Sequence, residues 1–183
     1  MLESGDIFRV PASGLGKKMS QMVLPISEYY HFGLIFEAFE DDYIILESTP
    51  KGVNVGMLSW YLNKPGDEIS VLRADVDKDL RQAAPFALIP YARSGYGYWQ
   101  FGKLIWDGIK IWLRERRIRK IHYTEFQDFL DSDSPICTRA VEIAYLAVGA
   151  PIIDPNYPAI PAAFEDAINK GILKEIYYIK WEE

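Results

Sequence analysis

The chain contains a single cysteine, Cys137, and this is the side chain best suited to covalent chemistry. Ser134 is a favourable N-cap residue, Pro135 is a favourable first helical residue, and the apolar run that follows stops before Gly149. The sequence therefore predicts a helix over 135–148 with Cys137 in its first turn. Unpaired N–H groups and the positive end of the helix dipole favour the nucleophilic thiolate there. A lone cysteine is also commonly an inert, small residue of the core, and that alternative stays open.

A histidine and a carboxylate stand near the ends of two apolar segments that are expected to pair. Residues 31–37 and 43–48 both have the composition of strands, and an acidic turn at 40–42 separates them. A hairpin through this turn puts Glu47 opposite His31 or one position away, with Cβ atoms about 5 Å apart when directly opposite. A carboxylate beside an imidazole can fix its tautomer and raise its basicity. A surface His–Glu pair is the alternative, but the flanking apolar runs predict strands buried on both faces, so the polar ends suggest the rim of a site.

Other chemistry has less support in the sequence. His122 is a rival base, but it follows a charged helix and lies in no apolar strand. The two histidines have no spaced cluster of Cys, Asp or Glu around them, so we expect no metal site. Gly95-Tyr96-Gly97 follows no clear strand and lacks the rest of a phosphate loop. We therefore expect no cofactor.

The elements that must position these residues can be outlined from hydrophobic periodicity and turn signals. Strands are predicted at 6–10, 31–37, 43–48, 52–55, 69–73 and 173–181, and helices at 15–24, 75–91, 102–120, 135–148 and 162–170, with a helical turn at 58–62. The helix at roughly 75–91 is expected to be interrupted near Pro85 and Pro90. The strands cluster early without regular βαβ alternation, which favours an α+β fold. We expect a single domain over 1–183, in which an antiparallel sheet packs against the helix carrying Cys137.

Composition limits the class of protein. The chain has 183 residues, is 49% hydrophobic and 14% aromatic, and carries a formal net charge of −6. These values argue against disorder and against a general nucleic-acid binder. No apolar run approaches the length of a transmembrane helix, and Met1–Gly5 lead straight into a strand, leaving no room for a signal peptide. A cytoplasmic location in the producing cell is expected, with release by another route left open.

A basic segment ends the helix predicted at 102–120. Its cations are Arg114, Arg116, Arg117, Arg119 and Lys120. Cations near a helix C-terminus are favourable in any case, so a solvated face is one interpretation. The other is weak contact with an anionic polymer or a membrane surface.

The order of these motifs resembles the circularly permuted branch of the NlpC/P60 papain-like superfamily, the YiiX-like cysteine hydrolases. The likeness is carried by Gly5-Asp6-Ile7-Phe8, Tyr30-His31-Phe32-Gly33-Leu34-Ile35-Phe36, Ile44-Ile45-Leu46-Glu47-Ser48, Gly52-Val53, Ile69-Ser70-Val71-Leu72-Arg73 and Cys137 at the start of a helix. The resemblance spans roughly residues 5–148 and implies a papain-like fold. It implies Cys137 as nucleophile, His31 as base and acid, and Glu47 as the residue that orients His31.

The chain departs from the family pattern at several positions. Tyr30 stands where the family has a small residue before its histidine, and Thr138 and Arg139 follow the cysteine where Ser and an acidic residue are usual. A Tyr-Asp pair upstream of the cysteine corresponds to Tyr96-Gly97, without the acid. We assign Tyr30 and Tyr96 to substrate binding.

The resulting expectation is a cysteine peptidase or amidase that cleaves amide bonds through an acyl-enzyme. The resemblance implies peptides or acylated small molecules as substrates, with cell-wall peptides among them. Two alternatives remain open: a thiol acyltransferase or lipid amide or ester hydrolase on the same triad, and a non-catalytic binding module on the papain-like scaffold.

Overall fold

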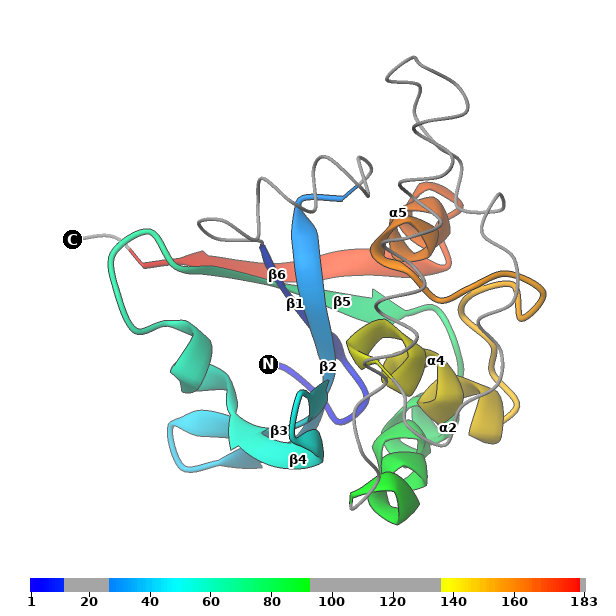
Figure 1. Ribbon diagram of the computed structural model, residues 1–183, viewed down its shortest axis with the longest axis horizontal. Coiled ribbons are helices and arrows are strands. Elements are labelled where there is room, and N and C mark those ends of the chain that lie inside the picture. Colours follow the sequence, from blue (N-terminus) through cyan, green and yellow to red (C-terminus); the bar gives the residue numbers. More distant parts are fainter. Residues whose placement is uncertain (12–26, 93–135, 182–183) are drawn as a thin grey trace.

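The computed structural model describes residues 1–11, 27–92 and 136–181, and this part is built on a six-stranded antiparallel sheet (Figure 1). The strands are β1 (Ile7–Pro11), β2 (Tyr29–Phe39), β3 (Asp42–Thr49), β4 (Gly52–Met57), β5 (Glu68–Ala74) and β6 (Leu173–Lys180). Their order across the sheet is β4-β3-β2-β1-β5-β6. The α+β class with an antiparallel sheet, predicted from sequence, is confirmed.

Three α-helices and two 3₁₀ segments complete the described elements. They are η1 (Leu58–Tyr61), α2 (Lys78–Ala83), η2 (Ala84–Tyr91), α4 (Cys137–Ala147) and α5 (Pro161–Asn169). None of the described helices has the length and apolar character needed to cross a membrane. The helices predicted at 15–24 and 102–120 lie outside the described residues.

The helix predicted at roughly 75–91, with interruptions near Pro85 and Pro90, is an α-helix only in its first half. Asp77 caps the start of α2, accepting a hydrogen bond from the Asp79 N–H at 2.8 Å. After Ala83 the chain tightens into η2, which contains Pro85 and Pro90. Proline has no N–H to donate and its ring crowds the preceding turn, so a regular α-helix cannot continue through this segment.

One face of the sheet packs against the helices. In Figure 1, α2, α4 and α5 gather on the same side of the strands. Strand and helix side chains form one core there, including Ile7, Phe32, Leu34, Ala140, Val141, Ala144, Tyr145 and Phe164. Each fully buried large apolar side chain contributes about 1.5–3 kcal/mol relative to exposure. The sheet therefore packs against the helix that carries Cys137.

The other face of the sheet holds a second, smaller core. It is formed by Leu2, Phe8, Val10, Ile35, Ile45, Leu58, Ile69 and Val71, with Tyr43, Tyr61, Leu62 and Ile179 packed against it. The central strands are thus buried on both faces between Phe32 and Ile35, as their continuous apolar runs predict.

Candidate active site

Cys137 is the first residue of α4. The preceding Ile136 is extended (φ −72°, ψ 167°) and provides no side-chain cap. The predicted start of this helix, with Ser134 as N-cap and Pro135 as first residue, is therefore wrong by two residues. The predicted stop is confirmed, since α4 ends at Ala147 and Gly149 adopts a left-handed φ of 73°.

Buried contacts near both ends of α4 fix its position, one with the segment before β1 and one with β2. The Tyr145 hydroxyl, fully buried, donates to the carbonyl of Gly5 at 2.7 Å. The Cys137 Sγ lies 3.7 Å from the Tyr30 carbonyl oxygen, and Cys137 is buried. The thiol thus sits beside the first residues of β2, next to His31.

His31 and Glu47 face each other where β2 and β3 stop pairing. The last pair between these strands is Gly33 with Glu47. Glu47 is therefore two positions from His31 along the ladder, and not opposite or one position away as the sequence predicts. A register shift between Ile35 and Glu37 moves the pairing. Side chains two positions apart along a strand point to the same face of the sheet, so the His31 and Glu47 side chains still lie together.

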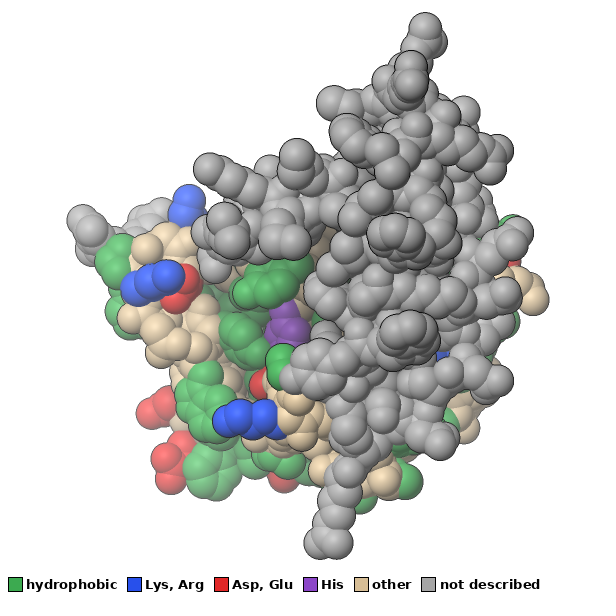
Figure 2. All heavy atoms as spheres, viewed as in Figure 1, with side chains coloured by type: hydrophobic (Ala, Val, Ile, Leu, Met, Phe, Trp, Pro, Cys, Tyr) green, Lys and Arg blue, Asp and Glu red, His purple; other side chains and the backbone are tan. Residues whose placement is uncertain are grey.

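The His31 and Glu47 side chains are joined by a short hydrogen bond. His31 Nε2 lies 2.5 Å from Glu47 Oε2, and the two side chains are 14% and 7% exposed. Figure 2 shows a histidine side chain at the molecular surface, with hydrophobic side chains beside it. This pair is consequently shielded from water on most sides, which strengthens its electrostatic interaction.

The environment of His31 favours its protonated form. Burial lowers the pKa of the imidazole, but hydrogen bonds to Cys137 and Glu47 outweigh burial and raise the pKa from 6.5 to about 9. Because Nε2 is engaged by Glu47, Nδ1 is the nitrogen available to Cys137. The arrangement can therefore hold an imidazolium between a sulfur and a carboxylate at neutral pH.

Tyr61 is a further member of this cluster that sequence reasoning missed. Its hydroxyl donates a short hydrogen bond to Glu47 Oε2. Its ring centroid lies 5.5 Å from that of His31. The only sequence signal was an aromatic residue in a predicted helical turn at 58–62, which says nothing about its partner.

Phe8 and Gly33 shape the floor beneath the imidazole. They are paired across β1 and β2, and a Cβ placed on Gly33 would lie 2.4 Å from Phe8 Cε1. The Phe8 ring therefore occupies the space that a side chain at position 33 would need. It lies 6.0 Å from the His31 ring, which it helps to bury.

The remaining predicted site residues are placed as follows. Tyr30 is 45% exposed, and its ring centroid lies 6.4 Å from that of His31, at the edge of the site. Ser27, two residues before β2, donates a hydrogen bond to Glu165 at 2.9 Å. Tyr96, His122 and the basic segment of residues 114–120 lie outside the described residues.

The described residues contain no group of three or more His, Cys, Asp or Glu side chains arranged to hold a metal ion. His31 Nε2 and Glu47 Oε2 are hydrogen-bonded to each other.

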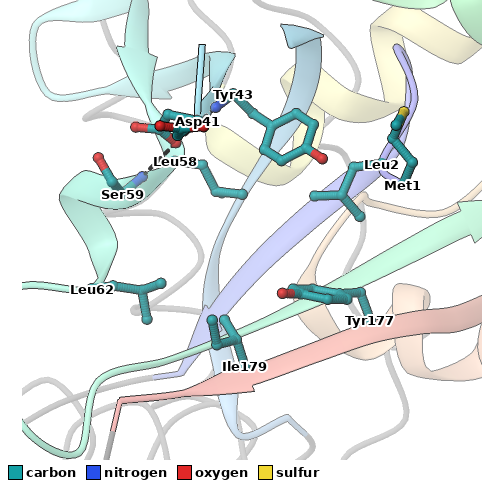
Figure 3. Close-up of a pocket in the computed structure, with 10 residues that line it drawn as sticks. Met1, Leu2, Asp41, Tyr43, Leu58, Ser59, Leu62, Tyr177 and Ile179 are labelled. Carbon is teal, nitrogen blue, oxygen red and sulfur yellow. Dashed lines mark hydrogen bonds between the residues drawn. The ribbon is translucent and has the colours of Figure 1, made fainter. Parts of the chain in front are cut away.

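A pocket of about 240 Å³ opens elsewhere on the second core (Figure 3). The Tyr43 and Tyr177 side chains point into it from β3 and β6. The other lining residues are Met1, Leu2, Asp41, Asp42, Leu58, Ser59, Leu62 and Ile179. Cys137, His31 and Glu47 are not among them, so this pocket does not mark the candidate active site.

Comparisons with known proteins place the fold. No protein-family model and no curated protein matches the chain. Among solved structures, the α+β fold is similar to the crystal structure of the metalloprotein yiiX from Escherichia coli O157:H7 (DUF1105), with a TM-score of 0.64 and 14% identity. The match covers 99% of this chain and 98% of that one. At this identity the likeness extends to the fold alone.

Proposed function

We propose that the chain is a papain-like cysteine hydrolase of the permuted NlpC/P60 type, cleaving amide bonds with Cys137, His31 and Glu47. The observation that carries this proposal is one imidazole hydrogen-bonded to both a thiol and a buried carboxylate. Nucleophile, base and orienting group in that order are the arrangement that activates a thiol for acyl transfer. The fold shared with yiiX is consistent with it.

The first half-reaction forms a thioester. His31 Nδ1 takes the proton of Cys137, and the thiolate attacks the amide carbonyl carbon to form a C–S bond. Backbone N–H groups in the first turn of α4 lack intrahelical partners, so the Cys137 N–H is available to the developing oxyanion. When the C–N bond breaks, His31 passes its proton to the departing amine.

The second half-reaction consumes water. His31 takes a proton from the water molecule as its oxygen attacks the thioester carbonyl. The C–S bond then breaks, and the proton returns to the thiolate, leaving a carboxylic acid and the free enzyme. Glu47 stabilises the imidazolium in both halves without taking its proton.

Peptides, and cell-wall peptides in particular, are the substrates we propose, because the resemblance of the motifs implies them. Purified muropeptides and acylated lipids should therefore be tested side by side, with Cys137→Ala protein as the blank. Release of new amino groups from the muropeptides is the expected result. Acyl release from lipids would instead indicate a lipid amide or ester hydrolase, and acyl transfer to an added amine would indicate a thiol acyltransferase, each using the same three residues.

Thiol reactivity separates an enzyme from a binding module before any substrate is known. Cys137 is the only cysteine, so every alkylated thiol reports this site. We expect iodoacetamide to label native protein faster than glutathione at about pH 6.5, because an adjacent imidazolium favours the thiolate. His31→Ala should abolish the difference. Labelling no faster than glutathione would contradict the proposal.

A further inference from the structure

The Glu47 carboxylate accepts two hydrogen bonds on one oxygen. His31 Nε2 and the Tyr61 hydroxyl both contact Oε2. In the described part of the chain, these are the hydrogen bonds that hold this carboxylate, which is 7% exposed. Tyr61 is thus the side chain that can fix the position and charge distribution of Glu47 independently of His31.

Tyr61 can act here only as a donor. Burial raises its pKa, and the nearby Glu47 carboxylate raises it further, so the phenol keeps its proton at neutral pH. Oε2 must therefore accept from it. An oxygen that accepts from Tyr61 also accepts from His31, so Nε2 carries a proton and Nδ1 is left to exchange a proton with Cys137.

The surroundings of Tyr61 hold its hydroxyl in this position. Its ring packs against both Phe8 and His31, with its centroid 5.5 Å from that of each. The 3₁₀ segment that carries it is tied to β3 by the Ser59 N–H, which donates to Asp42 Oδ1 at 3.2 Å. Tyr61 therefore reaches Glu47 from a segment anchored to the same strand as Glu47.

We propose that Tyr61 is a positioning residue for the Glu47–His31 pair. Its hydroxyl keeps Glu47 as an acceptor toward Nε2 and weakens the attraction of the carboxylate for the imidazole proton. An imidazolium held less tightly by Glu47 gives its proton more readily to the departing amine. The kinetic consequence rests on the proposed function, whereas the effect on His31 does not.

The test compares the titration of His31 in wild-type protein and in Tyr61→Phe. Phenylalanine keeps the ring packed against Phe8 and His31 and removes the hydroxyl alone. Without that donor, the uncompensated carboxylate should raise the pKa of His31 above its value of about 9, by roughly half a unit. The NMR signal of His31 is assigned with the His31→Gln variant, which separates it from His122.

Tyr43→Phe is the matched control. Tyr43 packs against the same core but lines the separate pocket, so its loss should leave the His31 titration unchanged. An unchanged or lowered pKa in Tyr61→Phe would overturn the proposal, and so would an equal rise in Tyr43→Phe.

In turnover assays, Tyr61→Phe should lower kcat several-fold and leave KM unchanged. The alkaline limb of the profile of kcat against pH should move to higher pH. Failure of iodoacetamide labelling would reject the hydrolase function while leaving the titration result intact.

Discussion

Glu47 and His31 lie one diagonal step apart on the same face of β3 and β2, and a 2.5 Å hydrogen bond joins their side chains. The Cβ atoms of Glu47 and His31 would be closer if the two residues were directly opposite, but the glutamate side chain is long enough to span the diagonal. The residue opposite Glu47 is Gly33, whose missing side chain leaves the space taken by Phe8. The pair thus depends on a carboxylate of the right length and on a glycine beside it.

This geometry predicts graded losses of activity. His31→Ala should reduce turnover by about three to four orders of magnitude, because the triad acts as a unit. Glu47→Gln should lose less, since its amide oxygen can still accept from Nε2 while the negative charge is gone. Steady-state kinetics on whichever substrate the muropeptide and lipid assays identify would measure both losses. If His122→Ala proves as damaging as His31→Ala, the choice of base is wrong.

The raised pKa of His31 predicts a specific dependence of stability on pH. The folded pKa of about 9 exceeds the unfolded value of 6.5, so the contribution of protonated His31 is fully present below pH 6.5. It is lost as pH rises from there through about 9, and amounts to about 3 kcal/mol.

Urea unfolding at several pH values across this window would measure the effect. Wild-type protein should lose stability relative to His31→Gln as pH increases, so the two curves converge at the alkaline end. Glu47→Gln removes one of the groups that raise the pKa of His31, so the loss of stability between low and high pH should be smaller in this variant than in wild type. Parallel curves for wild type and His31→Gln would show that folding does not raise the pKa of His31.

Gly33→Ala should destabilise the protein and disturb the site. Its Cβ would lie 2.4 Å from Phe8 Cε1 and 2.8 Å from the Leu46 carbonyl oxygen, and the backbone atom cannot simply rotate away. We expect a loss of about 1–3 kcal/mol in the free energy of unfolding. Gly56→Ala on β4 is the control for stability. Its nearest contact is the Trp60 ring at 3.2 Å, which is 58% exposed and can move, and the contact with Glu47 Oε1 at 3.4 Å is an ordinary one. Equal losses in both variants would contradict the assigned role of Phe8.

The basic segment predicts binding that is independent of the chemistry. Replacing Arg116, Arg117 and Arg119 by Gln should weaken association with anionic cell-wall polymer or anionic vesicles, most clearly at low salt. Turnover of a small soluble substrate should not change. Co-sedimentation at two ionic strengths measures this. Binding insensitive to salt and to these substitutions would indicate a solvated helix face.

The sequence alone was sufficient for the local features of the molecule. Apolar runs around Leu34 and Ile45 predicted the central strands, and the stop near Gly149 predicted the end of the Cys137 helix, because these signals depend on burial and on backbone conformation close in the chain. The antiparallel sheet followed from the order of strands and turns. Pro85 and Pro90 predicted an interruption of the helix at roughly 75–91, but the sequence did not show that the chain continues there as a 3₁₀ segment.

Tertiary structure alone decided how the site is assembled. A register shift beyond Ile35 set the diagonal between His31 and Glu47, because the pairing of Phe39 with Asp42 at the turn would otherwise put Glu47 opposite Leu34. The sequence showed neither this shift nor the exact turn, so hairpin reasoning placed the pair opposite or one position apart. The contact between Tyr61 and Glu47 joins two segments whose approach depends on how β4 and η1 fold back over the second core. Residue types and periodicity identify which groups can react, but packing between distant segments determines which atoms meet, because those distances depend on side-chain volumes throughout the core.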